Sequence, residues 1–286
     1  MNRLKIENVS LVYSNGHQAL ADINLDISNG IFGLLGPNGA GKSSLMKTIV
    51  GLQKPTTGKL SFNGFDIVNN PLYIQKYLGF LPQDFGVYPN VSAYNLLDHI
   101  AKLKGVESKK QRHNQIMELL DKVNLTDFRN KEVHTFSGGM KQRFGVAQAL
   151  LGDPKIVIVD EPTAGLDPEE RNRFNNLLSN ISEDIIIILS THLVEDVRNL
   201  CSQMAIIKDG SIVTQGSPKD FIEQLKGNLW IKAISKEDLP NEKTKHQVIS
   251  TQLIQKVLHI TVFAEDCPDG FTGIEPTLEH VYFKNL

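Results

Sequence analysis

The sequence predicts an α/β fold built on a mixed or parallel sheet, with an antiparallel β subdomain, an inserted α-helical subdomain and a small α+β C-terminal extension. Residues 156–159 and 185–189 are apolar runs without polar alternation, which is typical of parallel strands covered by helices on both faces. Residues 168–179, between these two runs, are predicted to form the crossover helix. From 92 to 151 the apolar residues follow helical spacing, and strand-like runs return after Pro218.

The first part of the chain predicts the antiparallel β subdomain. Residues 4–13 and 20–27 have the spacing and composition of strands in an antiparallel sheet. Asn63 and Gly64 form a dipeptide between two apolar stretches, which is a strong hairpin signal. Residues 78–82 read as another short strand.

Two domains are predicted, at residues 1–216 and 217–286, with the helical subdomain at about 86–151. The second domain reads as a short helix, three strands and a last helix with proline near its start. These elements are expected at 219–226, 229–234, 247–253, 257–263 and 275–283.

The strongest motif lies between a strand-like run at 31–35 and a helix-like run at 44–50. It matches the pattern G-x-x-x-x-G-K-[ST], so the sequence predicts a P-loop rather than a glycine-rich turn without a ligand. Such a loop turns backbone N–H groups toward an anion, and the helix that follows presents its positive end to the same phosphates. Within it, Lys42 is expected to neutralise the β- and γ-phosphates and Ser43 to bind Mg²⁺. The predicted phosphate-binding residues are Gly36, Pro37, Asn38, Gly39, Ala40, Gly41, Lys42, Ser43 and Ser44.

A second glycine motif, Phe136-Ser137-Gly138-Gly139-Met140, precedes an Ala-rich helical run, the apolar run at 156–159 and Asp160-Glu161. Ser-Gly-Gly alone is a common flexible loop. In this order, after a P-loop, the motifs resemble the ATP-binding cassette (ABC) family of transporter ATPase subunits, whose usual signature is Leu-Ser-Gly-Gly-Gln. Phe136 and Met140 depart from that signature at the first and fifth places. The length and position of the C-terminal extension resemble those of ABC-2 type exporter ATPases for drugs, antibiotics and polysaccharides.

The acidic pair is interpreted as the catalytic centre. Two adjacent carboxylates at a strand end repel each other, so the pair is best explained beside a cation rather than as a solvated acidic turn. Asp160 is expected to hold Mg²⁺, and Glu161 to polarise the attacking water. The resemblance implies that Gln83 senses Mg²⁺ and the γ-phosphate, and that His192 bonds the γ-phosphate and orients the water.

Three of these interpretations have structural alternatives. Gln83 could be a surface loop residue, and His192 could cap the sheet. Tyr13 could stack on adenine, as the family's aromatic residue at this place does, or could be a core aromatic of its strand. The other histidines have no ligand spacing and are given no role.

The family resemblance implies partners. Ser137, Gly138 and Gly139 are expected to bind the ATP held by the P-loop of another cassette, in a head-to-tail dimer, with Asp167 in a loop (the D-loop) along the dimer seam. This sequence contains one P-loop and one signature, so the second cassette is expected from another chain, giving a homodimer. The implied reaction is Mg²⁺-dependent ATP hydrolysis. An integral membrane permease is the implied further partner, with the protein peripheral on the cytoplasmic face of the membrane.

Two other functional classes are considered. A soluble ABC mechanoenzyme of translation or DNA repair usually has two cassettes in one chain or a long coiled-coil insertion, and neither is present. An ATP-gated regulatory module without catalysis would have a broken catalytic set. The chain has 286 residues and a formal net charge of −2, so no basic field predicts a nucleic-acid partner.

Overall fold

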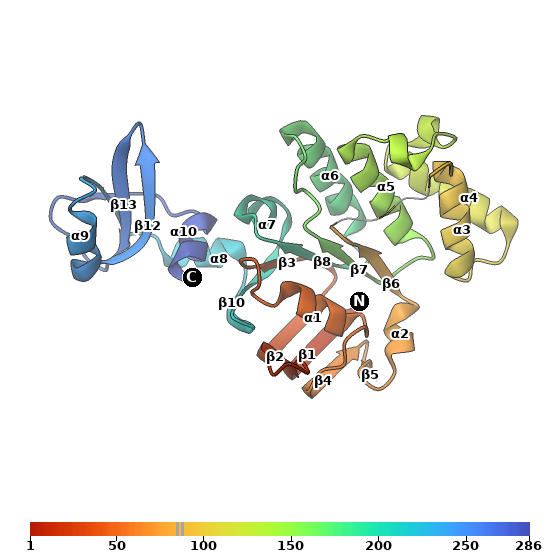
Figure 1. The fold of residues 1–286 in the computed structure, drawn as a ribbon, viewed down its shortest axis with the longest axis horizontal. Coiled ribbons are helices and arrows are strands. Elements are labelled where there is room, and N and C mark those ends of the chain that lie inside the picture. The colour runs from red at the N-terminus through yellow and green to blue at the C-terminus, as the bar shows by residue number, and fades with distance from the viewer. Residues whose placement is uncertain (84–85, 87–88) are drawn as a thin grey trace. The chain divides into compact units, whose positions relative to one another are not determined.

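The computed structural model describes residues 1–83, 86 and 89–286, and the chain divides into two compact units, Met1–Ile212 and Val213–Leu286 (Figure 1). The first unit contains an antiparallel sheet with strand order β2-β1-β4-β5. A six-stranded sheet has the order β10-β9-β3-β8-β7-β6, and the residues of β10 are divided between the two units. The predicted α/β fold with mixed sheets is therefore confirmed. The prediction of 217–286 as a separate domain stays a prediction.

The antiparallel sheet forms as the alternation predicts. Leu4 and Ile6 are buried while Glu7 is exposed, and Ile6 pairs with Leu25 on one side and Leu60 on the other. The apolar face of the sheet is thereby set by the sequence pattern. Its strands are β1 (Arg3–Val12), β2 (Gln18–Ser28), β4 (Thr57–Phe62) and β5 (Phe65–Asp66).

The central strands of the larger sheet are parallel. β3 pairs in parallel with β8 and β9, and β7 pairs in parallel with β6 and β8. The carboxyl ends of β3, β8, β7 and β6 therefore meet at one edge of the sheet, where α/β proteins bind ligands. The strands of this sheet are β3 (Gly30–Leu35), β6 (Leu78–Leu81), β7 (Ile156–Asp160), β8 (Ile186–Thr191), β9 (Gln203–Lys208) and β10 (Ser211–Gly216).

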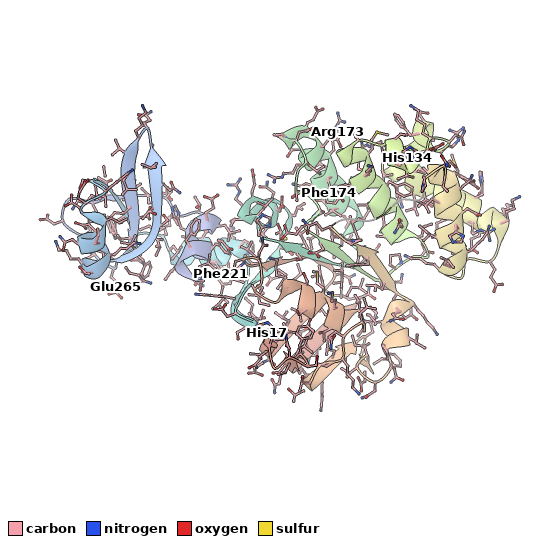
Figure 2. All side chains as sticks on the ribbon, in the orientation of Figure 1. His17, His134, Arg173, Phe174, Phe221 and Glu265 are labelled. Atoms are coloured by element: carbon pink, nitrogen blue, oxygen red, sulfur yellow. The ribbon has the colours of Figure 1, made fainter. Side chains whose placement is uncertain are left out.

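One buried core joins the two sheets through α1 (Lys42–Ile49) (Figure 1). It contains Leu45 and Met46 of α1 together with apolar residues of β1, β2 and β4 and of β3, β7 and β8. The crossover helix α6 spans Pro168–Ile181 and confirms the predicted connection between β7 and β8. On α6, Phe174 is 1% exposed, whereas Arg173 is exposed and pairs with two glutamates of its own helix (Figure 2).

Three long helices lie between β6 and β7: α3 (Ala93–Leu103), α4 (Lys109–Lys122) and α5 (Gly138–Leu150). Each begins after a serine whose hydroxyl accepts a hydrogen bond from the backbone N–H three residues on, a standard N-cap. The N-cap serines are Ser92, Ser108 and Ser137. The insertion is confirmed as helical, although Asp84, Phe85, Val87 and Tyr88 near its predicted start lie outside the described residues.

The second unit contains an antiparallel sheet of order β12-β13-β11-β14 with a small core of Ile260, Val262 and Phe271. The predicted last helix begins later than expected, because Thr277 forms a capping box with His280 and the helix starts at Leu278, beyond Pro276. The elements of this unit are α8 (Pro218–Gln224), β11 (Leu229–Ile234), α9 (Leu239–Lys245), β12 (Gln247–Ile254), β13 (Val257–Phe263), β14 (Thr272–Gly273) and α10 (Leu278–Lys284).

Several elements were not predicted. They are mostly short helices, whose one or two turns give no clear apolar period, and the strands β9 and β10. The helices are α2 (Pro71–Gln75), α7 (Val194–Leu200) and α9. Within the described part of the chain, no helix is both long and apolar enough to cross a membrane.

Candidate active site

A pocket of about 310 Å³ lies where the parallel strands end. The P-loop follows β3, Gln83 follows β6, and the acidic pair ends β7, so the sheet topology brings these segments together. The pocket is lined by His17, Ala19, Pro37, Asn38, Gly39, Gly41, Lys42, Ser43, Ser44, Gln83, Asp160 and Glu161. Most of the residues predicted to bind phosphate therefore face one space.

The P-loop glycines are required for different reasons. A Cβ on Gly36 would overlap the carbonyl oxygen of Ile207, and a Cβ on Gly41, which has φ 106°, would lie 2.7 Å from the carbonyl oxygen of Ala19. Gly39 also has a positive φ, of 81°, but no atom of the described chain lies within 4 Å of where its Cβ would be. The loop is thus packed on one side and open at Gly39, as a cradle for a ligand would be.

The side chain of Lys42 folds back onto the P-loop residues that precede it. Its Nζ donates hydrogen bonds to the carbonyl oxygens of Gly36 (2.6 Å) and Pro37 (3.2 Å), and it lies 3.7 Å from Glu161 Oε1. Burial lowers the pKa of Lys42, while the charges of Glu161 and Asp160 oppose that shift. The side chain is 7% exposed, so its charge is poorly solvated and is directed into the pocket.

Asp160 is the last residue of β7, Glu161 follows the strand, and the two carboxylates differ in environment. Asp160 pairs with Ser190 of β8, and burial raises the pKa of Asp160 against the opposing charge of Lys42. Glu161 has a left-handed backbone conformation, φ 47°, and its N–H donates to the carbonyl oxygen of Ser190 at 2.8 Å. Positive φ is uncommon for such a residue and marks a position that the surrounding structure must hold.

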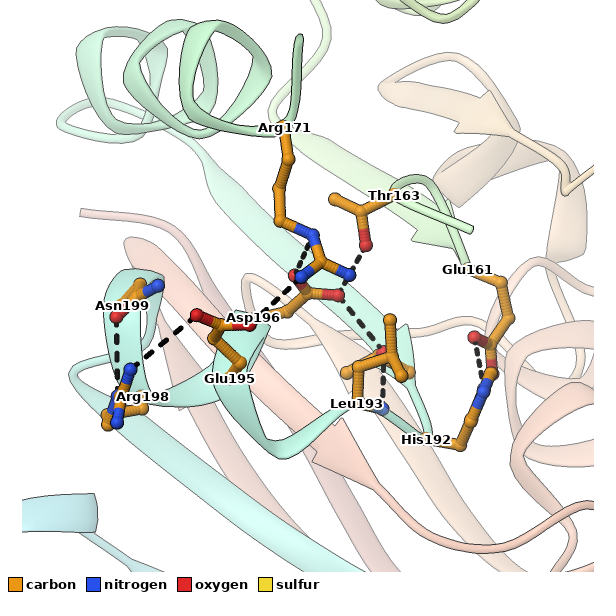
Figure 3. A network of polar contacts seen from close by, with 10 residues as sticks. Glu161, Thr163, Arg171, His192, Leu193, Glu195, Asp196, Arg198 and Asn199 are labelled. Carbon is orange, nitrogen blue, oxygen red and sulfur yellow. Dashed lines mark hydrogen bonds and ion pairs between the residues drawn. The ribbon is translucent and has the colours of Figure 1, made fainter. Parts of the chain in front are cut away.

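Glu161 contacts His192 directly. His192 Nδ1 and Glu161 Oε2 are 2.6 Å apart, and the Glu161 side chain is buried while that of His192 is half-exposed (Figure 3). Glu161 therefore lies between the ammonium group of Lys42 and the imidazole of His192. The prediction placed His192 on a phosphate, and the structure adds a carboxylate partner that the sequence did not indicate.

The residues predicted to bind Mg²⁺ line the same pocket. Ser43, Gln83 and Asp160 offer hydroxyl, amide and carboxylate oxygens, the ligand type that Mg²⁺ prefers. Over the described residues, no group of three or more His, Cys, Asp or Glu could hold a metal ion by itself. The donor set therefore fits a Mg²⁺ that takes its other oxygens from water and phosphate.

Tyr13 does not line the pocket, whereas His17 does. The Tyr13 hydroxyl is hydrogen-bonded to Ser44 Oγ at 3.0 Å, and its ring packs partly against the core. The rings of Tyr13 and His17 are parallel, with centroids 6.5 Å apart. The role of Tyr13 stays a prediction, and His17 is a pocket residue that sequence reasoning left without a role.

The Ser-Gly-Gly segment begins α5 but does not line the pocket. Ser137 Oγ accepts from the N–H of Met140 at 3.2 Å, and a Cβ on Gly139 would overlap the carboxylate of Glu170 in α6. Glu170 Oε2 also lies 3.4 Å from Arg143 Nε. Phe136, which departs from the usual signature, is buried and packs edge-to-face on Phe144. The substitution is therefore accommodated as an apolar anchor.

Asp167 is the N-cap of α6, where its side chain accepts from the N–H of Glu170 at 2.8 Å. Sequence reasoning missed two residues nearby, the buried Asp196 of α7 and Thr163, which are hydrogen-bonded to each other. No sequence signal distinguished Asp196, because it stands in a short stretch of mixed charge.

A glycine loop that wraps a lysine, an acidic strand end and an adjacent histidine define a nucleotide-hydrolysing protein of the P-loop class. The sequence profile of the ABC transporter family matches residues 20–164. The chain belongs to the ABC transporter family, as a nucleotide-binding cassette that hydrolyses ATP.

Curated relatives include two proteins of Bacillus subtilis. The ABC transporter ATP-binding protein YxlF is 32% identical over 82% of this chain and 77% of its own length. The linearmycin resistance ATP-binding protein LnrL is 33% identical over 80% of this chain and 73% of its own length. ABC transporter A family member 8 of Dictyostelium discoideum is 38% identical over 71% of this chain, which spans only 24% of that relative.

Solved structures have the same fold. CbiO1 of Clostridium perfringens, part of the ABC transporter complex cbiONQ, matches with a TM-score of 0.70 and 29% identity over 77% of this chain and 90% of its own. A dimeric ATP-binding cassette in a post-hydrolysis state, bound to ADP and Pi, matches with a TM-score of 0.67 and 27% identity over 75% of this chain and 98% of its own.

The contact between Gly139 and Glu170 predicts different effects of alanine at adjacent glycines of α5. Gly139→Ala is expected to lower the free energy of unfolding by ~0.2–1 kcal/mol relative to Gly138→Ala, because the new methyl group must displace the Glu170 side chain from its ion pair with Arg143. Gly138→Ala is the matched control, since no atom lies within 4 Å of its added Cβ. Urea denaturation of both variants measures the difference, and equal stabilities would contradict the prediction.

Proposed function

We propose that this chain is the ATP-hydrolysing subunit of an ABC exporter, which powers a separate integral membrane permease through ATP-driven dimerisation of two cassettes. The observation that carries the proposal is the position of Glu161, buried between Lys42 and His192 at the edge of the P-loop pocket. A carboxylate in that position can act on a water molecule next to the terminal phosphate of ATP.

Phosphate binding is assigned to the P-loop and α1. The ammonium group of Lys42 has three N–H donors, and two of them bond to the carbonyl oxygens of Gly36 and Pro37. The third donor can bond to a phosphate oxygen. The N–H groups around Gly39 and Gly41 and the N-terminus of α1 add positive potential to the same space. The phosphates of ATP would thus be bound mainly by charge-assisted hydrogen bonds.

Mg²⁺ is assigned to Ser43, Asp160 and Gln83, whose oxygen-bearing side chains line the pocket. When bound, the ion would neutralise negative charge on the β- and γ-phosphates. Burial raises the pKa of Asp160 despite the nearby charge of Lys42, and the added positive charge of a bound Mg²⁺ would favour its ionised form. Gln83 lies two residues after the end of β6 and before the helical insertion. A change in the pocket could therefore be passed through Gln83 to that insertion.

Glu161 is assigned as the general base, and His192 as the group that fixes it and reaches a phosphate. A ring that donates from Nδ1 to Glu161 and from Nε2 to a phosphate oxygen carries both protons. In that state the imidazolium would orient Glu161 toward the water and add positive charge at the γ-phosphate. Glu161 then takes the proton of the attacking water.

The dimer is proposed because the Ser-Gly-Gly segment does not line the pocket of its own chain. Its N–H groups stand at the start of α5, a helix of 13 residues whose N-terminal end favours an anion. A second cassette, most simply another copy of this chain, would bring this end to the γ-phosphate in the head-to-tail arrangement. Asp167, at the N-cap of α6, would lie along the seam.

The direction of transport is inferred from relatives. A linearmycin resistance ATP-binding protein shares 33% identity with this chain over most of both lengths, and resistance by a transporter is most simply achieved by export. The permease would hold the cassette on the cytoplasmic face of the membrane. Membrane association that requires co-expression of a permease would support this location.

Lys42→Ala is expected to weaken ATP binding by at least ~10-fold, because a charge-assisted hydrogen bond contributes about 1.5–3 kcal/mol. Isothermal calorimetry with Mg-ATP measures the affinity. Lys59→Ala, which removes the same charge from an exposed position of β4, is the control and should bind like the wild type. Wild-type affinity of Lys42→Ala would show that phosphate binds elsewhere.

The trans role of Ser137 predicts complementation in mixed dimers. A dimer of one Lys42→Ala subunit and one Ser137→Arg subunit should contain one intact composite site and one doubly broken site. It should therefore bind about one ATP per dimer, whereas either variant alone should lose both sites. Differently tagged subunits, purified in tandem and assayed for bound ATP, give the stoichiometry. Loss of binding in the mixed dimer would contradict the head-to-tail arrangement.

Glu161→Gln should trap the ATP-bound dimer. Glutamine keeps the shape of the side chain but cannot accept a proton from water, and loss of a general base typically costs ~10²–10⁴-fold in rate. Size-exclusion chromatography should show a dimer with Mg-ATP but not with Mg-ADP. Undiminished turnover, or a monomer under both conditions, would refute the assignment of Glu161.

A further inference from the structure

A fully buried carboxylate, Asp196 of α7, lies at the centre of a polar network beside the catalytic pair (Figure 3). Its Oδ2 accepts hydrogen bonds from Thr163 Oγ1 (2.5 Å) and from Thr191 Oγ1 (3.3 Å). Both threonines are also buried, at 1% and 0% exposed. A buried charge is costly unless it is well partnered, so a carboxylate retained here is expected to have a specific task.

The bond to Thr191 fixes the segment that carries His192. Thr191 Oγ1 donates to Asp196 and accepts from the N–H of Leu193 at 2.9 Å, so the residues on both sides of His192 are tied to one hydroxyl. This bracket holds the backbone at His192 while leaving its ring free to reach Glu161. The backbone that carries the His192 ring is therefore held by Asp196 through Thr191.

The bond to Thr163 fixes the segment that carries Glu161. Thr163 is two residues beyond Glu161, whose left-handed backbone needs support from its surroundings. One carboxylate oxygen thus holds both loops whose side chains, Glu161 and His192, meet at 2.6 Å. A change in either loop would alter the angle at which Glu161 faces the pocket.

The other oxygen of Asp196 faces α6. Asp196 Oδ1 lies 3.6 Å from Arg171 Nε, and Arg171 Nη1 donates to Glu195 at 2.9 Å. Neither Asp196 Oδ1 nor Arg171 Nε has a hydrogen-bond partner among the described residues, so Arg171 contributes its charge without a well-formed bond. The two threonine hydroxyls are therefore the groups that Asp196 positions most closely.

We propose that Asp196 is a positioning residue for ATP hydrolysis, which holds Thr163 and Thr191 and thereby fixes the Glu161–His192 pair without touching the nucleotide. The inference rests on the proposed role of Glu161 as the general base. Displacement of a catalytic group by about 1 Å can cost ~10²-fold in rate even when the substrate still binds. The effect of Asp196 is thus on turnover through Glu161, and nucleotide affinity is retained.

Thr163→Val tests this with little change in volume. It removes the hydroxyl that Asp196 accepts from, and kcat for ATP should fall ~10–100-fold while the dissociation constant for Mg-ATP changes less than ~3-fold. Thr163→Ser restores the hydroxyl and should recover most of kcat. Asp196→Ala should behave like Thr163→Val, and because the valine variant leaves the carboxylate in place it decides the question if Asp196→Ala does not fold.

A double-mutant cycle separates positioning from a general structural role. In a Glu161→Gln background, Thr163→Val should change the residual rate less than ~2-fold, because the group that it positions is already gone. Asp98→Ala is the structural control. It removes the 2.7 Å ion pair with Arg112 in the helical insertion and should lower the unfolding midpoint while leaving kcat within ~3-fold of the wild type.

Each outcome has one meaning. The positioning role would be overturned if Thr163→Val lowered the rate of ATP hydrolysis by the same factor in the wild-type and the Glu161→Gln backgrounds. It would also be overturned if Thr163→Ser did not recover kcat. Unchanged kcat in Thr163→Val together with a large loss in Glu161→Gln would overturn it as well and leave the assignment of the base intact. Full turnover in Glu161→Gln would overturn both.

Discussion

The site depends on keeping one carboxylate, that of Glu161, buried and correctly directed. Its backbone has a left-handed conformation at the end of a parallel strand, and its side chain lies between Lys42 and His192. Lys42 in turn is held by the carbonyl oxygens of its own loop, so that the positive charge is fixed before any ligand arrives. Electrostatic preorganisation of this kind lowers the reorganisation needed during a reaction. The buried core that joins α1 to both sheets provides the rigid support that this arrangement requires.

Much of the site could be predicted because parallel strands bring the segments that follow them to one edge of the sheet. The sequence marked a P-loop after one apolar run and acidic residues after another, and parallel strands must present their carboxyl ends together. Gln83, Ser43 and Asp160 accordingly line one pocket. The bond between His192 and Glu161 could not be predicted, since the rotation of a side chain after a strand depends on packing that the sequence does not encode locally. The same limit applies to His17, which reaches the pocket from the turn between β1 and β2.

The elements that escaped prediction are those stabilised by tertiary contacts. The helix that carries Asp196 has seven residues, too few for a clear apolar period, and it is held by its buried carboxylate and by Val197. The last helix starts at Leu278 because a threonine and a histidine cap it, a combination less familiar than serine with glutamate. In contrast, α3 and α4 of the insertion were recognisable from their apolar periodicity, and α5 from its alanine-rich run after the Ser-Gly-Gly motif.

The glycine at the second position of α5 has a mechanical meaning. Because Gly139 has no side chain, Glu170 of α6 packs against the first turn of α5, where it also lies beside Arg143. The first turn of α6 is thereby packed directly against the start of α5. A molecule that displaced the start of α5 would therefore also displace the start of α6.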